Sequence, residues 1–204
     1  MAHRKNKYDS GMTLIELMVV IAIIAILAVI STLSMDFIHK ERVTSSIKEV
    51  ASDLKKVRMD AMTAGPTTAA PNTRGMGIRF TSVSGYDLFT FNDCSGDYRY
   101  EVDGCTGSTR EEADTRTVTL PASLQLKRLS GGSLVSPANA LDDIIMFDRF
   151  GQARTSEWAM AAEGTPLILV IQHVSGLHGK CIRLDSNSIR EGSWNGTSNT
   201  CTAN

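Results

Sequence analysis

Residues 11–35 read GMTLIELMVVIAIIAILAVISTLSM. From Leu17 to Met35 this stretch runs for nineteen residues without a charge, a glycine or a proline. At about 1.5 Å per residue, a helix of that length reaches roughly 28 Å, close to the hydrocarbon thickness of a bilayer. Arg4, Lys5 and Lys7 precede it, and such a basic flank favours a cytoplasmic N-terminus with the rest of the chain exported. The stretch therefore predicts a membrane-spanning helix.

Glu16 is the residue that an ordinary signal or anchor does not explain. An ordinary secretory signal would carry a small-residue cleavage site after its apolar core, and the Ser and Thr residues of 31–34 imitate such a site only weakly. A plain single-pass anchor is the second alternative. Neither requires a carboxylate at the edge of the apolar run, where it is costly to bury and usually serves a partner.

The segment Gly11-Met12-Thr13-Leu14-Ile15-Glu16, followed by the apolar run, resembles the class III signal of type IV prepilins and type II secretion pseudopilins. The resemblance implies that residues 1–11 are a leader, which prepilin peptidase removes by cutting between Gly11 and Met12. It also implies methylation of the new amino group of Met12. Glu16 would then assist assembly with other pilins or pseudopilins, by pairing with the N-terminal amine of a neighbouring subunit. Many family members have Phe where this chain has Met12.

A helical stripe continues beyond the apolar run. Its members recur at spacings of three and four residues, with charged residues on the other faces: Val43, Ile47, Val50, Leu54, Val57 and Ala61. Gly65 and Pro66 form a helix stop. We expect a helix over 12–64, with 12–35 as its transmembrane and assembly half and 36–64 as its amphipathic half. A break between the two halves is the alternative. Family members often have a proline in mid-helix, and this chain has none before Pro66.

The remainder, residues 65–204, reads as a β-rich head. Segments of alternating or aromatic character, separated by Gly and Pro, predict strands at 76–82, 86–91, 98–102, 118–120, 124–129, 144–147, 167–173 and 181–184. The expected fold class is α+β: a long N-terminal helix packed on a mainly antiparallel head of one or two sheets. The pattern of 144–153 and 166–170 resembles the GspH/FimT branch of minor pseudopilins and minor pilins, and 181–184 and 188–192 resemble its ending loosely.

The four cysteines lie in the head. An even number at loop-like spacing downstream of an export signal suggests two disulfides in an oxidising compartment, although four reduced thiols are the alternative. Four cysteines allow three pairings. We predict Cys94–Cys105 and Cys181–Cys201, because each pair closes a local loop that has few apolar side chains to hold it.

Catalytic and metal-binding patterns are not found in the sequence. The four histidines form no metal motif, and the acidic residues Asp93, Asp97, Glu101 and Asp103 lack EF-hand spacing. We therefore expect no enzyme activity, no cofactor, no metal and no small-molecule substrate. The function that the resemblance implies is a minor pilin or pseudopilin of a type II secretion pseudopilus or type IV pilus. Such a subunit is anchored once in the bacterial inner membrane, with its head in the periplasm, before it enters a filament.

The alternative function is that of a DNA-binding minor pilin acting in DNA uptake. Its candidate residues are Arg183 and Arg190. From Asp36 onward the chain has eighteen Lys and Arg against twenty Asp and Glu, which is a poor balance for gripping phosphates. Strand geometry places Asp185 on the same face as Arg183. We therefore do not expect nucleic acid to be a partner.

Overall fold

The computed structural model describes residues 12–63, 73–94, 96–97, 99–101, 111–138, 143–157, 160 and 166–203. For residues 30–34 and 114 it describes the backbone alone. The chain divides into two compact units, Met1–His39 and Lys40–Asn204, and the second contains the whole β head.

The long helix α1 runs from Leu14 to Thr63 as one element of 50 residues. The expected long N-terminal helix is therefore present without a break in its described part; it begins at Leu14 and not at Met12, and its predicted last residue, 64, lies outside the described residues. No Gly or Pro interrupts these residues, which is the condition for an unbroken helix. The predicted stop at Gly65 and Pro66 lies outside the described residues.

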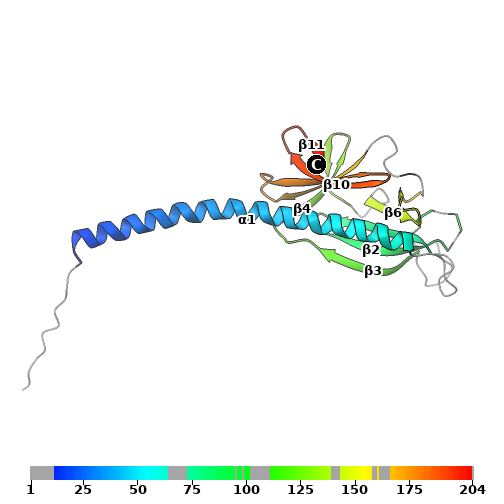
Figure 1. Cartoon of the computed structure of the whole chain (residues 1–204), viewed down its shortest axis with the longest axis horizontal. Coiled ribbons are helices and arrows are strands. Elements are labelled where there is room, and N and C mark those ends of the chain that lie inside the picture. Colours follow the sequence, from blue (N-terminus) through cyan, green and yellow to red (C-terminus); the bar gives the residue numbers. More distant parts are fainter. Residues whose placement is uncertain are drawn as a thin grey trace, which may run out of the picture. The chain divides into compact units, whose positions relative to one another are not determined.

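Two antiparallel sheets make up the head (Figure 1). The first has the order β3-β2-β1-β6-β7 and the second the order β11-β10-β9-β8-β4-β5. The α+β class and the two-sheet head are thus as expected. The strand bounds are β1 Thr73–Ser82, β2 Gly85–Asn92, β3 Glu112–Thr119, β4 Leu124–Ser130, β5 Ser133–Val135, β6 Ile144–Asp148, β7 Ala153–Arg154, β8 Leu167–His173, β9 Gly179–Asp185, β10 Ser188–Asn195 and β11 Thr200–Ala203.

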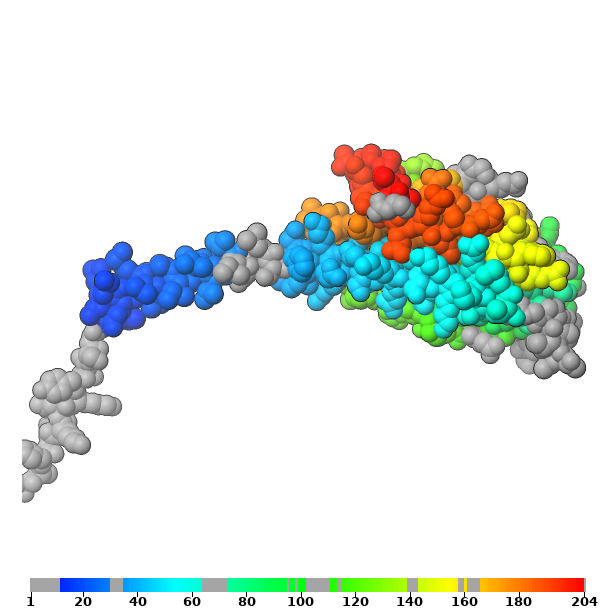
Figure 2. Space-filling model, in the orientation of Figure 1, coloured from blue at the N-terminus to red at the C-terminus, as the bar shows by residue number. Residues whose placement is uncertain are grey.

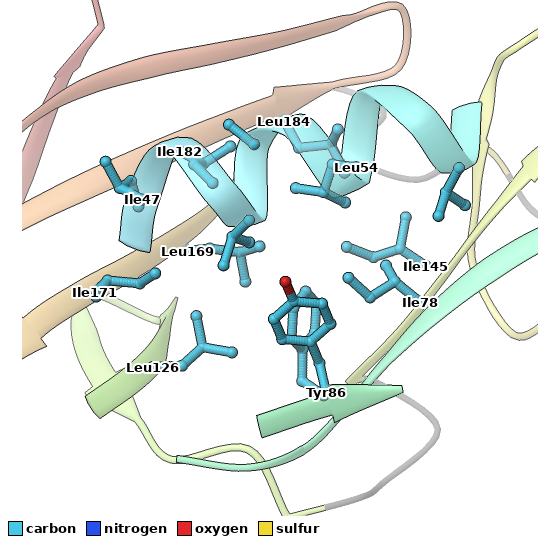
Figure 3. Close-up of a cluster of buried hydrophobic side chains, with 14 of the residues drawn as sticks. Ile47, Leu54, Ile78, Tyr86, Leu126, Ile145, Leu169, Ile171, Ile182 and Leu184 are labelled. Atoms are coloured by element: carbon cyan, nitrogen blue, oxygen red, sulfur yellow. The ribbon is translucent and has the colours of Figure 1, made fainter. Parts of the chain in front are cut away.

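The amphipathic half of α1 supplies one wall of the main core. The six stripe residues, together with Ala51, are at most 2 % exposed. They belong to one cluster with side chains from both sheets, including Ile78 and Tyr86 of the first sheet and Leu169 and Ile182 of the second (Figure 3). The opposite side of this half of the helix lies at the surface, between strands of the two sheets (Figure 2). Both sheets therefore pack against the same helix through this stripe.

A second, smaller core covers the other face of the first sheet. It consists of Phe89, Phe91, Tyr100, Ile144 and Met146. Ile145 and Phe147 of β6 belong to the main core and Ile144 and Met146 to the second, so both faces of the strand are covered. Such a strand reads as a continuous apolar run, because both of its faces are covered.

The prediction of a strand at 98–102 was wrong for its described part. Residues 99–101 are not in a strand, and positions 98 and 102 lie outside the described residues. The ring of Tyr100 packs against Phe89 and Phe91, with centroids 5.7 and 6.4 Å away. An aromatic residue thus anchors an irregular segment on the outer face of the sheet, and aromatic content alone does not distinguish this arrangement from a strand.

Candidate functional site

The N-terminus of α1 is closed by a reciprocal cap between Thr13 and Glu16. The Thr13 backbone N–H donates to Glu16 Oε2 at 2.7 Å, and the Thr13 hydroxyl donates to the same oxygen at 2.9 Å. The Glu16 backbone N–H donates to Thr13 Oγ1 at 3.3 Å. This is the capping-box arrangement, in which Thr is the N-cap residue and Glu stands three positions later. It gives Glu16 a structural role that the sequence prediction did not include.

The Glu16 carboxylate keeps one oxygen outside this cap. Both hydrogen bonds from Thr13 end on Oε2, and among the described residues Oε1 accepts none. The neighbouring side chains are apolar and open to the surroundings, with Leu14 76 % and Ile15 69 % exposed. Within the described part of the chain, the arrangement therefore leaves one carboxylate oxygen without a hydrogen bond on a largely apolar surface.

The exposed apolar surface extends along the first part of α1. Its exposed large side chains between the cap and residue 29 are Leu14, Ile15, Leu17, Met18, Val19, Val20, Ile21, Ile23, Ile24, Ile26, Leu27 and Val29. An apolar surface of this extent marks a site of protein or membrane contact. Across the residues that the structure describes, no helix meets the combined length and hydropathy needed to cross a membrane.

The predicted processing site is only partly visible. Met12 is described and 64 % exposed, whereas Gly11 lies outside the described residues. Cleavage between them and methylation of Met12 therefore stay predictions.

The predicted Cys181–Cys201 disulfide is present in the structure, with 5.9 Å between the two Cα atoms. It joins β9 to β11, which stand on opposite sides of β10 in the sheet order. Gly192 of β10 is the register partner of Cys181, and a Cβ atom at Gly192 would meet Thr202 O at 2.4 Å. Because Gly192 has no side chain, β11 can approach β10 closely enough to pair with it. For the predicted Cys94–Cys105 pair, Cys105 lies outside the described residues.

Arg183 and Arg190, the candidate DNA-binding residues, are brought together by the sheet. They are register partners on β9 and β10. Arg183 Nε lies 3.3 Å from Asp185 Oδ1, as the shared strand face led us to expect. The pair therefore carries a carboxylate beside it, which reduces its attraction for phosphate.

The acidic segment around residue 93 is used internally. Asp93 accepts a hydrogen bond from Arg74 Nε at 3.3 Å and from the Gly96 N–H at 2.7 Å, and Asp97 accepts one from the Arg99 N–H. In the described part of the chain, no three carboxylate, histidine or cysteine side chains form a group suited to a metal ion. Asp103 lies outside the described residues.

A buried ionic network on the outer face of the first sheet was missed by the sequence analysis. Arg79 donates to Asp87 Oδ2 at 3.0 Å, to Tyr100 Oη at 3.0 Å and to Glu112 Oε1. Asp87 also accepts from Thr117 Oγ1 at 2.7 Å, and burial together with the bond to Glu112 raises the pKa of Tyr100. The charges of Arg79, Asp87 and Glu112 are paired with one another within the fold.

Comparison with known proteins gives two findings. Residues 6–32 match the family described as "Prokaryotic N-terminal methylation motif". The structure is similar to that of the minor pseudopilin EpsH from the Type 2 Secretion System of Vibrio cholerae, with a TM-score of 0.45 and 14 % identity, over 74 % of this chain and 97 % of that one. Comparison with curated proteins yields no match. Residues 6–32 therefore carry the N-terminal methylation motif of type IV pilin-like proteins.

Proposed function

We propose that this protein is a minor pilin or pseudopilin that assembles through the first part of α1 into a type II secretion pseudopilus or a type IV pilus. The observation that carries the proposal is the methylation motif at 6–32, which includes the exposed apolar side chains of α1 from Leu14 to Val29. Before assembly, residues 12–35 hold the precursor in the inner membrane, and the head lies in the periplasm. Prepilin peptidase removes residues 1–11 and the new N-terminus at Met12 is methylated.

Glu16 is the assembly residue in this proposal. Its free Oε1 is suited to an amino group of a neighbouring subunit, and the methylated amine of Met12 supplies such a charge. An ion pair in apolar surroundings requires both partners, because an unpaired charge there is strongly disfavoured. The contact therefore selects one register of neighbouring helices.

The test must separate the charge of Glu16 from its role as a helix cap. Gln is accepted at this position of a capping box, so Glu16→Gln keeps the hydrogen bond to Thr13 and loses only the charge. Thr13→Val is the matched control, because it loses the cap hydroxyl and keeps the Glu16 charge. We expect Glu16→Gln to remain in the membrane fraction and to be depleted from purified filaments, while Thr13→Val is incorporated.

Mass spectrometry of the mature N-terminal peptide accompanies this experiment. It should find methylated Met12 as the first residue in the parent and in both variants, which shows that processing was unaffected. A mature chain beginning near Ser34 would contradict the proposed processing. Normal incorporation of Glu16→Gln, or equal loss of both variants, would contradict the assembly role of the charge.

A gene-deletion phenotype is needed to decide between a type II secretion pseudopilus and a type IV pilus. A deletion of the gene that abolishes release of exoproteins and leaves twitching intact would assign the subunit to secretion, and the opposite result would assign it to a pilus.

A further inference from the structure

A cavity of about 250 Å³ lies in the unit Lys40–Asn204, between α1 and one end of the second sheet. Its lining combines Lys40, Thr44, His178, Lys180, Ser193 and Trp194 with the apolar Val43 and Leu177 and with Gly179. The lining contains two lysines and no carboxylate. A small site of this composition favours an anion.

The positions of the polar and aromatic groups are set by the sheet. Lys180 and Ser193 are register partners on β9 and β10, and Lys180 Nζ lies 3.3 Å from Ser193 Oγ. A Cβ atom at Gly179 would meet Trp194 Cδ1 at 2.7 Å. The absence of a side chain at Gly179 therefore allows the indole ring to lie against the strand at the edge of the cavity.

Exposed apolar residues border the cavity. The turn between β8 and β9 presents Val174 and Leu177, which are 53 % and 78 % exposed. Leu177 also lines the cavity. Exposed apolar side chains beside lysines and a tryptophan are the combination found where proteins contact the polar boundary of a membrane.

The position of Lys40 in the sequence agrees with this boundary. Lys40 follows Met35, the last residue of the predicted membrane segment, by five residues within α1. Five helical residues rise about 7.5 Å. The headgroup layer on each side of a bilayer is about 5–8 Å thick, and a lysine side chain extends its ammonium group several ångströms toward water.

We propose that the Lys40–Lys180 cavity binds the phosphate of an anionic phospholipid headgroup while the subunit is anchored in the membrane. The two ammonium groups pair with the phosphate, Trp194 lies at headgroup depth, and Leu177 and Val174 contact the outer ends of the acyl chains. The inference rests on the proposed membrane-anchored precursor. It adds a lipid contact that holds the head at the membrane surface before assembly.

The experiment uses the full chain reconstituted into vesicles of phosphatidylcholine with increasing fractions of phosphatidylglycerol. Each vesicle also contains a little lipid with a fluorescence quencher on its headgroup. A Trp158→Phe background leaves Trp194 as the only tryptophan, since the chain has two. Co-flotation with the vesicles measures anchoring separately.

We expect Trp194 to be quenched more strongly as the phosphatidylglycerol fraction rises. Each lysine near an anionic surface contributes about 1 kcal/mol, or roughly a fivefold factor. The Lys40→Gln, Lys180→Gln double variant should therefore associate with phosphatidylglycerol about 25-fold more weakly. Lys56→Gln is the matched control, because Lys56 is an exposed lysine on the same helix that does not line the cavity, and it should behave as the parent does.

Equal quenching in the parent and the double variant would overturn the inference, as would an equal loss in Lys56→Gln. Inorganic phosphate added to the chain in neutral detergent is the third arm. A saturable change in Trp194 fluorescence on addition of phosphate alone would assign the cavity to a free anion and overturn its assignment to lipid. A chain that floats without quenching contradicts this inference alone, whereas a chain that does not float contradicts the proposed function and this inference with it.

Discussion

Replacement of Arg79 by Met is expected to destabilise the head strongly. Arg79 stands between Asp87 and Glu112, and the three side chains are 16 %, 12 % and 7 % exposed. Removal of one partner from a buried ionic group leaves the others uncompensated, which costs about 3–5 kcal/mol. With a urea dependence of about 2 kcal/mol per molar, the midpoint of unfolding should fall by roughly 1.5–2.5 M.

Two further variants make this prediction specific. Arg116→Met is the matched control, because Arg116 also contacts a carboxylate, Asp53, at 3.4 Å but is 58 % exposed. An exposed pair contributes only about 0–1 kcal/mol. The triple variant Arg79→Met, Asp87→Asn, Glu112→Gln removes all three charges, so it should recover much of the stability that the single variant loses.

The assay is urea unfolding of the full chain in neutral detergent, followed by near-ultraviolet circular dichroism. The reasoning would be refuted if Arg79→Met lowered the midpoint no more than Arg116→Met. It would also be refuted if the triple variant were as unstable as the single one, since the loss would then come from packing and not from unpaired charge.

Three other outcomes are expected. Burial raises the pKa of Glu111 above its ordinary 4.5, so the fold loses stability as pH rises from about 4.5 through the raised value. Glu111→Gln should therefore unfold at a higher urea concentration than the parent at pH 7 and not at pH 4. An equal difference between variant and parent at both pH values would contradict this. Tyr86 Oη donates to Asp53 Oδ2 at 2.8 Å, so Tyr86→Phe should lower the unfolding free energy by about 1.5–3 kcal/mol, and an unchanged urea midpoint would count against that bond. In a gel-shift titration at about 0.15 M salt, the chain should bind duplex DNA weakly or not at all, and micromolar binding lost in an Arg183→Ala, Arg190→Ala variant would make DNA capture the leading function.

The long helix and its buried stripe were predictable because their signal is local. Val43 to Ala61 repeat at helical spacing, and a stripe of that kind has only one way to be buried. The nineteen-residue apolar run has neither Gly nor Pro to end a helix. The Cys181–Cys201 pair was predicted because it closes a local loop with few apolar side chains, and the sequence alone left three pairings of the four cysteines open.

The head was less predictable because its strands depend on contacts distant in sequence. Most residues of β3 are polar, yet the strand pairs with β2 along its length, and the sequence indicated only its last residues. β10 contains Gly192, whose missing side chain allows the close approach of β11. The partners of Arg79 come from β2, β3 and the segment around Tyr100, so no local sequence pattern predicts the ionic network that they form.

Glu16, the candidate assembly residue, differs from the residues of the cores and of the Arg79 network in how little the fold depends on it. Glu16 belongs to neither core, and in its one described structural role, the cap on Thr13, Gln can take its place. A carboxylate in the first turn of a helix gains only about 0.3–1 kcal/mol from the helix dipole, whereas the charges of the Arg79 network are paired with one another within the fold. Among the described residues, the carboxylate of Glu16 keeps one oxygen that could accept a charge from another subunit, and for this reason Glu16→Gln is the variant that separates assembly from folding.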